Sequence, residues 1–184
     1  MANGFVTVSP AVRHGTGVAP ISTNWCLAQR FLLPEGSWEL NEIGIWVSAD
    51  AGYTGWVHVG VFTDDAANLC PGVLVAGTDS GGLFHDTATV VKINYAYSVK
   101  PEITGAVGGT YYWLAKGFKD PYLNIDYLAA GGTSLYKYGV VYPGWPTDTE
   151  WHTHSNLPSD YGTYAVYESS TGGKVVIGSM LSIG

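Results

Sequence analysis

The stretch from Trp25 to Gly77, WCLAQRFLLPEGSWELNEIGIWVSADAGYTGWVHVGVFTDDAANLCPGVLVAG, decides the fold class of this chain. Its runs Ile43–Val47 and Val57–Val61 each place an apolar residue at every second position. An extended chain turns alternate side chains to the same face, so this period of two is typical of strands packed on a core. No helical spacing of apolar residues separates the runs. The sequence therefore predicts an all-β protein.

Similar runs recur at regular spacing along the rest of the chain. We expect strands near residues 26–33, 39–48, 55–63, 73–78, 88–100, 110–117, 122–128, 134–142, 163–168 and 174–182. In the run 88–100 the residues expected to face the core are Val91, Ile93, Tyr95, Tyr97 and Val99. Turns are expected at Gly-containing pairs, among them Glu35-Gly36, Pro71-Gly72 and Gly108-Gly109. Short strands with such turns predict a two-sheet antiparallel β-sandwich or jelly roll.

The length of 184 residues predicts one domain. Residues 1–24 contain Pro and Gly and little periodicity, so we expect an extended N-terminal arm with at most a short strand near Phe5–Val8. Such an arm is either a flexible tail or a segment that docks on a neighbour, and we expect docking. Residues 25–184 are then the sandwich domain.

Net charge limits the classes of partner. The chain carries a formal charge of −7, and its basic residues are scattered singly from Arg13 to Lys174. A surface that follows nucleic-acid phosphates needs clustered cations, so we expect no nucleic-acid partner. No apolar run approaches the roughly 20 residues that span a bilayer. The start MANGFVTVSP lacks the basic and apolar regions of a secretory signal, so we expect a protein made in the cytoplasm.

The low content of charged residues points to a surface of unusual composition. Only 12% of the residues are charged, against about 25% in a typical soluble domain. Glycine (25), tyrosine (13) and tryptophan (7) are abundant instead. A surface of this kind tolerates being covered by another protein surface. The alternative is an aromatic-packed sandwich whose exterior is simply weakly charged, and composition leaves both open.

Two cysteines, Cys26 and Cys70, allow one disulfide bond. A domain of this size does not need a disulfide for stability, so we expect two thiols, one of them buried.

The segment 143–162 interrupts the regular spacing of strands and is expected to be a long loop. Loops of this length inside a compact domain are usually functional, and rigid aromatic side chains serve binding loops well. The predicted ligand-binding residues, for a glycan or a protein partner, are Trp145, Asp148, Glu150, Trp151, His152, His154, Asn156 and Tyr161. The alternative is a loop that folds back and buries its own aromatic residues against one end of the sandwich.

No motif of catalytic or metal chemistry has the context it needs. The sequence Asp79-Ser80-Gly81-Gly82 matches the serine region of chymotrypsin-like proteases, but the order of the triad residues fails, and a Gly-Gly turn accounts for it. His152 and His154 would share one side of an extended segment, yet a third ligand at diagnostic spacing is missing. We therefore expect no enzyme, no cofactor and no metal.

Four short patterns in the first half of the domain carry a resemblance. They are Gln29-Arg30-Phe31, the alternating strand Leu40–Val47, the strand Val59–Asp64 with its Thr-Asp end, and Pro71-Gly72-x-Leu74. Together they resemble a broad group of β-jelly-roll modules found in bacterial surface proteins and in tailed-phage virions. In virions these modules are head decoration proteins, head fibres and tail accessory proteins. The resemblance covers about residues 25–78 and implies the fold more than the role.

Three features favour the virion over the bacterial surface: no signal, a single stand-alone domain and a weakly charged N-terminal arm. The resemblance then implies a non-enzymatic structural protein, located in the virion, that attaches to capsid or tail proteins through its arm or a sheet edge. Jelly rolls used in this way commonly form homo-oligomers, with a trimer favoured. The rival expectation is a carbohydrate-binding module that recognises glycans through the loop 143–162.

Overall fold

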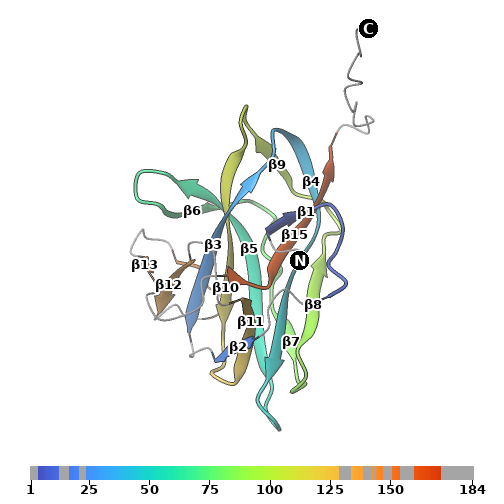
Figure 1. The fold of residues 1–184 in the computed structure, drawn as a ribbon, viewed down its shortest axis with the longest axis vertical. Coiled ribbons are helices and arrows are strands. Elements are labelled where there is room, and N and C mark those ends of the chain that lie inside the picture. The colour runs from blue at the N-terminus through green and yellow to red at the C-terminus, as the bar shows by residue number, and fades with distance from the viewer. Residues whose placement is uncertain are drawn as a thin grey trace, which may run out of the picture.

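The computed structural model describes residues 4–12, 17–20, 24–128, 134–138, 142, 144–146, 151–153 and 160–170 (Figure 1). Its regular structure over these ranges is entirely β-strand and forms two sheets, as a β-sandwich does. The all-β class and the two-sheet arrangement that the alternating runs predicted are thus confirmed. Over the same ranges, no helix has the length and apolar character required to cross a bilayer.

The first sheet has the described order β1-β15-β4-β11-β14, with β2 paired to β11 and with β8 and β9 paired to β4. Its strands are β1 (Gly4–Val6), β2 (Gly17–Pro20), β4 (Gly36–Ala49), β8 (Val91–Ala96), β9 (Glu102–Gly105), β11 (Leu123–Leu128), β14 (Asp160–Tyr161) and β15 (Thr163–Ser169).

The second sheet has the described order β13-β12-β3-β10-β5-β6, with β7 paired to β5. Its strands are β3 (Trp25–Leu33), β5 (Gly55–Asp65), β6 (Cys70–Leu74), β7 (Leu83–His85), β10 (Thr110–Phe118), β12 (Ser134–Tyr138) and β13 (His152–Thr153). Successive strands alternate between the two sheets from β3 to β5, and again from β9 to β12. Every pairing within the described residues is antiparallel except that of β1 with β15.

The core between the sheets contains the alternating residues that the sequence placed there. Ile43, Ile45 and Val47 of β4 and the three valines of β5, Val57, Val59 and Val61, are all 0% exposed. The pattern Leu40-x-x-Ile43 breaks the period of two, and the structure explains why. Val166 of β15 pairs with Glu42 whereas Tyr167 pairs with Leu40, so Asn41 is the extra residue of a β-bulge. The bulge keeps both Leu40 and Ile43 on the core side.

Three sequence expectations about strands and turns are wrong. The strand expected at 73–78 ends at Leu74, as part of β6. The strand expected at 88–100 ends at Ala96, as β8, and Val99 is 83% exposed rather than in the core. The chain leaves the ladder after Ala96, because the backbone N–H of Tyr97 donates instead to the carbonyl of Asn41 at the bulge (3.0 Å). Pro71-Gly72 lies inside β6 rather than in a turn. An edge strand tolerates proline, and Leu69, with φ of 51°, lies in the preceding turn.

The described parts of the N-terminal segment belong to the protein's own first sheet. β1 pairs with β15, and β2 pairs with β11. The ring of Phe5 packs edge-on against Tyr112 (6.0 Å between centroids) and Tyr167 (6.5 Å). Between the two strands, Ser9 is held on the outer face of the sheet, since Lys92 donates to its hydroxyl at 2.8 Å.

Candidate functional site

The outer face of the second sheet, turned away from the core, carries a second packed layer. Its fully buried residues are Ala28, Phe62, Cys70, Trp113 and Ala115, here called the outer cluster. The central strands of this sheet are therefore buried on both faces. Trp145 and Trp151 are half-buried and pack against this cluster from the segment that follows β12.

Small residues on β3, β5 and β10 make room for this layer. Ala28 pairs with Ala115, and Ala115 pairs with Gly60, so three small residues lie side by side across the sheet. A Cβ atom added at Gly60 would lie 3.1 Å from the Trp145 ring. One row along, a Cβ at Gly117 would lie 2.0 Å from Nε2 of His58. The two glycines thus allow the indole and the imidazole to lie close to the sheet.

His58, Asp79 and Trp145 form the polar centre of this layer. The rings of His58 and Trp145 are stacked, with centroids 3.9 Å apart and planes inclined by 19°. The indole Nε1 of Trp145 donates to Oδ2 of Asp79 at 2.8 Å, which fixes the ring in its plane. Tyr142 also contacts the imidazole, with its ring edge-on at 5.0 Å.

The imidazole of His58 is only 1% exposed, and both of its nitrogens lack a hydrogen-bond partner among the described residues. Oδ1 of Asp79 lies 3.8 Å from Nδ1, which is too far for a hydrogen bond. Burial disfavours the charged imidazolium and lowers the pKa of His58 to about 4, although the negative charge of Asp79 acts in the opposite direction. At neutral pH His58 is therefore an uncharged ring beneath Trp145.

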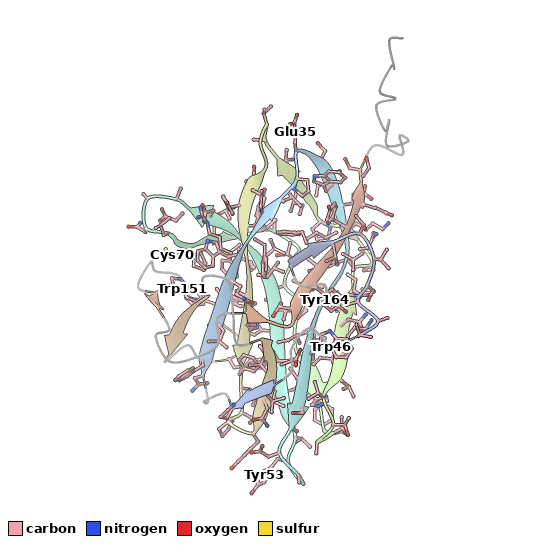
Figure 2. All side chains as sticks on the ribbon, viewed as in Figure 1. Glu35, Trp46, Tyr53, Cys70, Trp151 and Tyr164 are labelled. Atoms are coloured by element: carbon pink, nitrogen blue, oxygen red, sulfur yellow. The ribbon has the colours of Figure 1, made fainter. Side chains whose placement is uncertain are left out.

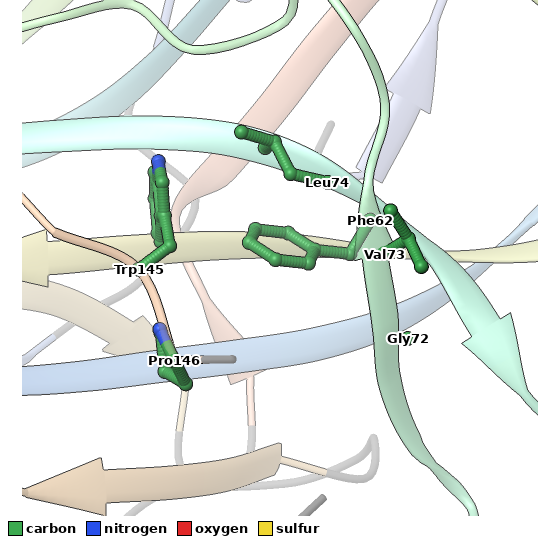
Figure 3. Close-up of a pocket in the computed structure, with 6 residues that line it drawn as sticks. All are labelled: Phe62, Gly72, Val73, Leu74, Trp145 and Pro146. Carbon is green, nitrogen blue, oxygen red and sulfur yellow. The ribbon is translucent and has the colours of Figure 1, made fainter. Parts of the chain in front are cut away.

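A pocket of about 450 Å³ opens beside this centre (Figure 3). Phe62 forms its base, Gly72, Val73 and Leu74 of β6 form one side, and Trp145 and Pro146 form the other. Figure 3 shows the Phe62 side chain pointing toward Trp145, and their rings meet edge to face at 5.1 Å. Pockets of roughly 300–1,000 Å³ with mostly apolar walls are typical of small-molecule sites.

A charged cluster borders the outer cluster on the side of Trp113. Arg30 donates from Nε to Oδ1 of Asp64 (2.8 Å) and from Nη2 to Oδ2 (2.5 Å), a bidentate pair. The indole Nε1 of Trp113 also donates to Oδ1 of Asp64 (2.7 Å). The guanidinium lies 4.0 Å from the centre of the Tyr111 ring, and its pKa is raised, chiefly by the hydrogen bond to Asp64.

The structure brings together some of the residues predicted for the loop and leaves others undescribed. Trp145 and Trp151 both pack against the outer cluster. The backbone of His152 lies in β13 of the second sheet and that of Tyr161 in β14 of the first sheet, so these two residues belong to different layers. Asp148, Glu150, His154 and Asn156 lie outside the described residues, as does the strand expected at 174–182.

The serine considered for catalysis and the two cysteines considered for a disulfide have other roles in the structure. Ser80 accepts from the Val59 N–H (2.9 Å) and donates to the carbonyl of Gly81 (2.9 Å), so its hydroxyl seals the edge of β5. Cys26 and Cys70 are both buried free thiols, and burial raises the pKa of Cys26 to about 12. Over the described ranges, no three His, Cys, Asp or Glu side chains are grouped as a metal site would require.

Sequence reasoning missed His58 as a member of this site. The signal was present, because the same alternation that directs Val57 and Val59 inward directs His58, Gly60 and Phe62 outward. A phenylalanine and a glycine at outward positions of a strand indicate a face that is covered. Comparison with known proteins adds no relative: no family model, no curated protein and no solved structure matches the chain.

Proposed function

We propose that this chain is a non-enzymatic structural and binding protein of a tailed-phage virion. In this proposal it is a capsid decoration, head fibre or tail accessory protein of the jelly-roll type, which oligomerises and attaches to the particle. The resemblance of residues 25–78 supplies the virion assignment, and the character of the surface supplies the mode of action.

The observation that carries the proposal is the number of large apolar side chains left exposed on a rigid sandwich. Among the described residues, Val107 is 88% exposed, Val99 83% and Val73 74%, and they lie on different turns and edges. Apart from Tyr53, Trp56, Phe84 and Tyr122, six further large apolar residues among those described exceed one-third exposure. With so few charges to separate them, such residues fit a surface that is covered in an assembly.

The use of the polar side chains also supports a structural role. Ser80 bonds to backbone groups, and Thr78 does the same, accepting from the Val61 N–H at 3.1 Å. Asp64 is paired with Arg30. Side chains occupied in this way stabilise the scaffold. Since β1 and β2 are strands of the first sheet, we place attachment at the exposed turns and sheet edges rather than at the arm.

Light scattering on a sizing column is expected to give a multiple of the 19.6 kDa chain mass, with a trimer favoured. Aspartate at Val73, Val99 or Val107, introduced singly, places a charge at each exposed region in turn. At least one variant should dissociate the assembly, because an unpaired charge buried in an interface is costly. The matched Val→Ala variants should retain the mass. A monomer at every concentration tested contradicts the proposal.

Carbohydrate binding at the segment 143–162 is the second candidate, and the pocket beside Trp145 favours it. The pocket has the volume of a small-ligand site, with the carboxylate of Asp79 near its aromatic wall. Val73 lines the pocket but is largely exposed, so Val73→Trp can fill the pocket without disturbing the core. If the pocket holds a sugar, Val73→Trp should abolish the affinity measured by calorimetry, and Val73→Ala should keep it. Equal affinity in both variants rules this site out.

A further inference from the structure

One end of the sandwich carries four exposed aromatic side chains, and none of them belongs to the segment 143–162. This is the end marked by Tyr53 in Figure 2, here called the Tyr53 end. Tyr53 and Tyr122 are stacked, with centroids 4.0 Å apart and planes inclined by 21°. Trp56 and Phe84 form a second pair at 5.2 Å. The exposed fractions are 47% for Tyr53, 39% for Tyr122, 37% for Trp56 and 48% for Phe84.

Backbone hydrogen bonds fix the chain segments that carry these rings. The loop after β4 is tied to the loop before β11, since the N–H of Asp50 donates to the carbonyl of Tyr122 (2.8 Å). The N–H of Tyr53 donates to the carbonyl of Asp50 (3.0 Å), which closes the turn. The N–H of Lys119 donates to the carbonyl of Trp56 (3.1 Å) and ties the start of β5 to the end of β10, just before the loop that carries Tyr122. Binding to fixed rings loses little conformational entropy.

Two carboxylates accept hydrogen bonds from residues at this end. Oδ1 of Asp50 accepts from the side-chain amide of Asn124 (2.8 Å), and Oδ2 of Asp120 accepts from the N–H of Trp56 (3.3 Å). A carboxylate offers about four acceptor positions, and each of these bonds uses one. The Tyr53 end therefore combines aromatic faces with hydrogen-bond acceptors of fixed orientation.

This combination selects one class of ligand. Nucleic acid and anionic sugars are repelled by the two carboxylates and by the net charge of −7. An apolar protein surface would remove water from the carboxylates without returning hydrogen bonds, which is unfavourable. A neutral sugar presents an apolar C–H face for the rings and hydroxyl donors for the carboxylates.

We propose that the Tyr53 end is a binding site for neutral carbohydrates. Tyr53, Trp56, Phe84 and Tyr122 stack on the sugar rings, and Asp50 and Asp120 accept hydrogen bonds from the hydroxyl groups. The site shares no residue with the lining of the pocket beside Trp145. It goes beyond the virion role and does not depend on it, because a particle protein attached elsewhere would leave this end exposed to a glycan.

The test is binding to an array of neutral oligosaccharides built from glucose, galactose, mannose and N-acetylglucosamine, followed by calorimetry with the strongest ligand. Tyr53→Ala and Trp56→Ala should each weaken binding about tenfold, the upper range for one aromatic contact. Asp50→Asn should also weaken it while leaving every ring in place. Tyr111→Ala is the matched control, because Tyr111 is an equally exposed tyrosine (44%) outside the Tyr53 end, and it should bind as the unmodified protein does.

Three results overturn the proposal: no binding anywhere on the array, a preference for sulfated or sialylated sugars, or affinity that the Tyr53 and Trp56 variants leave unchanged. Loss of binding in Val73→Trp alone would assign the sugar to the pocket instead. Since solution mass reports on assembly independently, failure of this site is distinguishable from failure of the virion proposal.

Discussion

Replacing Trp113 with alanine is expected to destabilise the protein by about 3–5 kcal/mol, the usual cost of deleting a buried aromatic side chain. Trp113 is 0% exposed and belongs to the outer cluster, so its removal leaves a cavity on the face of the second sheet away from the main core. It also removes the indole N–H that donates to Asp64. In a chain of this length the melting temperature should fall by roughly 10 °C.

Two further variants identify the cause of this loss. Trp113→Phe retains a six-membered ring but loses the pyrrole ring and its hydrogen bond to Asp64, so it should cost about 2–3 kcal/mol. Val99→Ala alters an exposed position and should stay within about 0.5 kcal/mol of the unmodified protein. Urea unfolding followed by circular dichroism measures all three. If Trp113→Ala costs no more than Val99→Ala, the outer cluster does not contribute to folding.

Acidification should destabilise the protein through His58 by about 3 kcal/mol between pH 6.5 and pH 4. The pKa of His58 is about 4 in the folded state, against 6.5 for an unperturbed histidine. Between these values the unfolded chain binds a proton that the folded protein does not, so the free energy of unfolding decreases as the pH falls. The stabilisation from the uncharged imidazole is full above pH 6.5, and its loss is complete below pH 4.

His58→Phe is the matched control, because it keeps an aromatic ring beneath Trp145 and removes the titration. Carboxylates also titrate in this range, so the informative quantity is the difference in unfolding free energy between the two proteins at each pH. That difference should change by about 3 kcal/mol from pH 7 to pH 4. A difference independent of pH would mean that the imidazole accepts its proton in the folded protein, paired with Asp79.

The alternation of apolar residues was sufficient to predict the core but not the second layer. Val57, Val59 and Val61 lie on the face of β5 that meets the first sheet, and they carry no information about its other face. The opposite face is covered by β6 and by the segment that carries Trp145, which lies far away in sequence. A strand buried on both faces has no simple alternation, and β10 is such a strand from Trp113 to Phe118. Contacts between distant segments leave no local pattern.

The candidate site was predictable only in part, because it too depends on contacts between distant segments. The loop pattern drew attention to Trp145 and Trp151, and both lie on the second sheet. Sequence alone could not pair Trp145 with His58 and Asp79, which precede it by more than sixty residues and meet it only through the fold. The aromatic pairs at the Tyr53 end also join different loops and strands.

Mass spectrometry of density-purified phage particles, from cells that carry the gene of this chain, tests the proposed virion role. Peptides of the chain should band with the particles at a fixed ratio to the major capsid protein and should remain bound after a second gradient. Recovery of the chain only in the soluble fraction of the lysate, with none in intact particles, would rule out the proposed role.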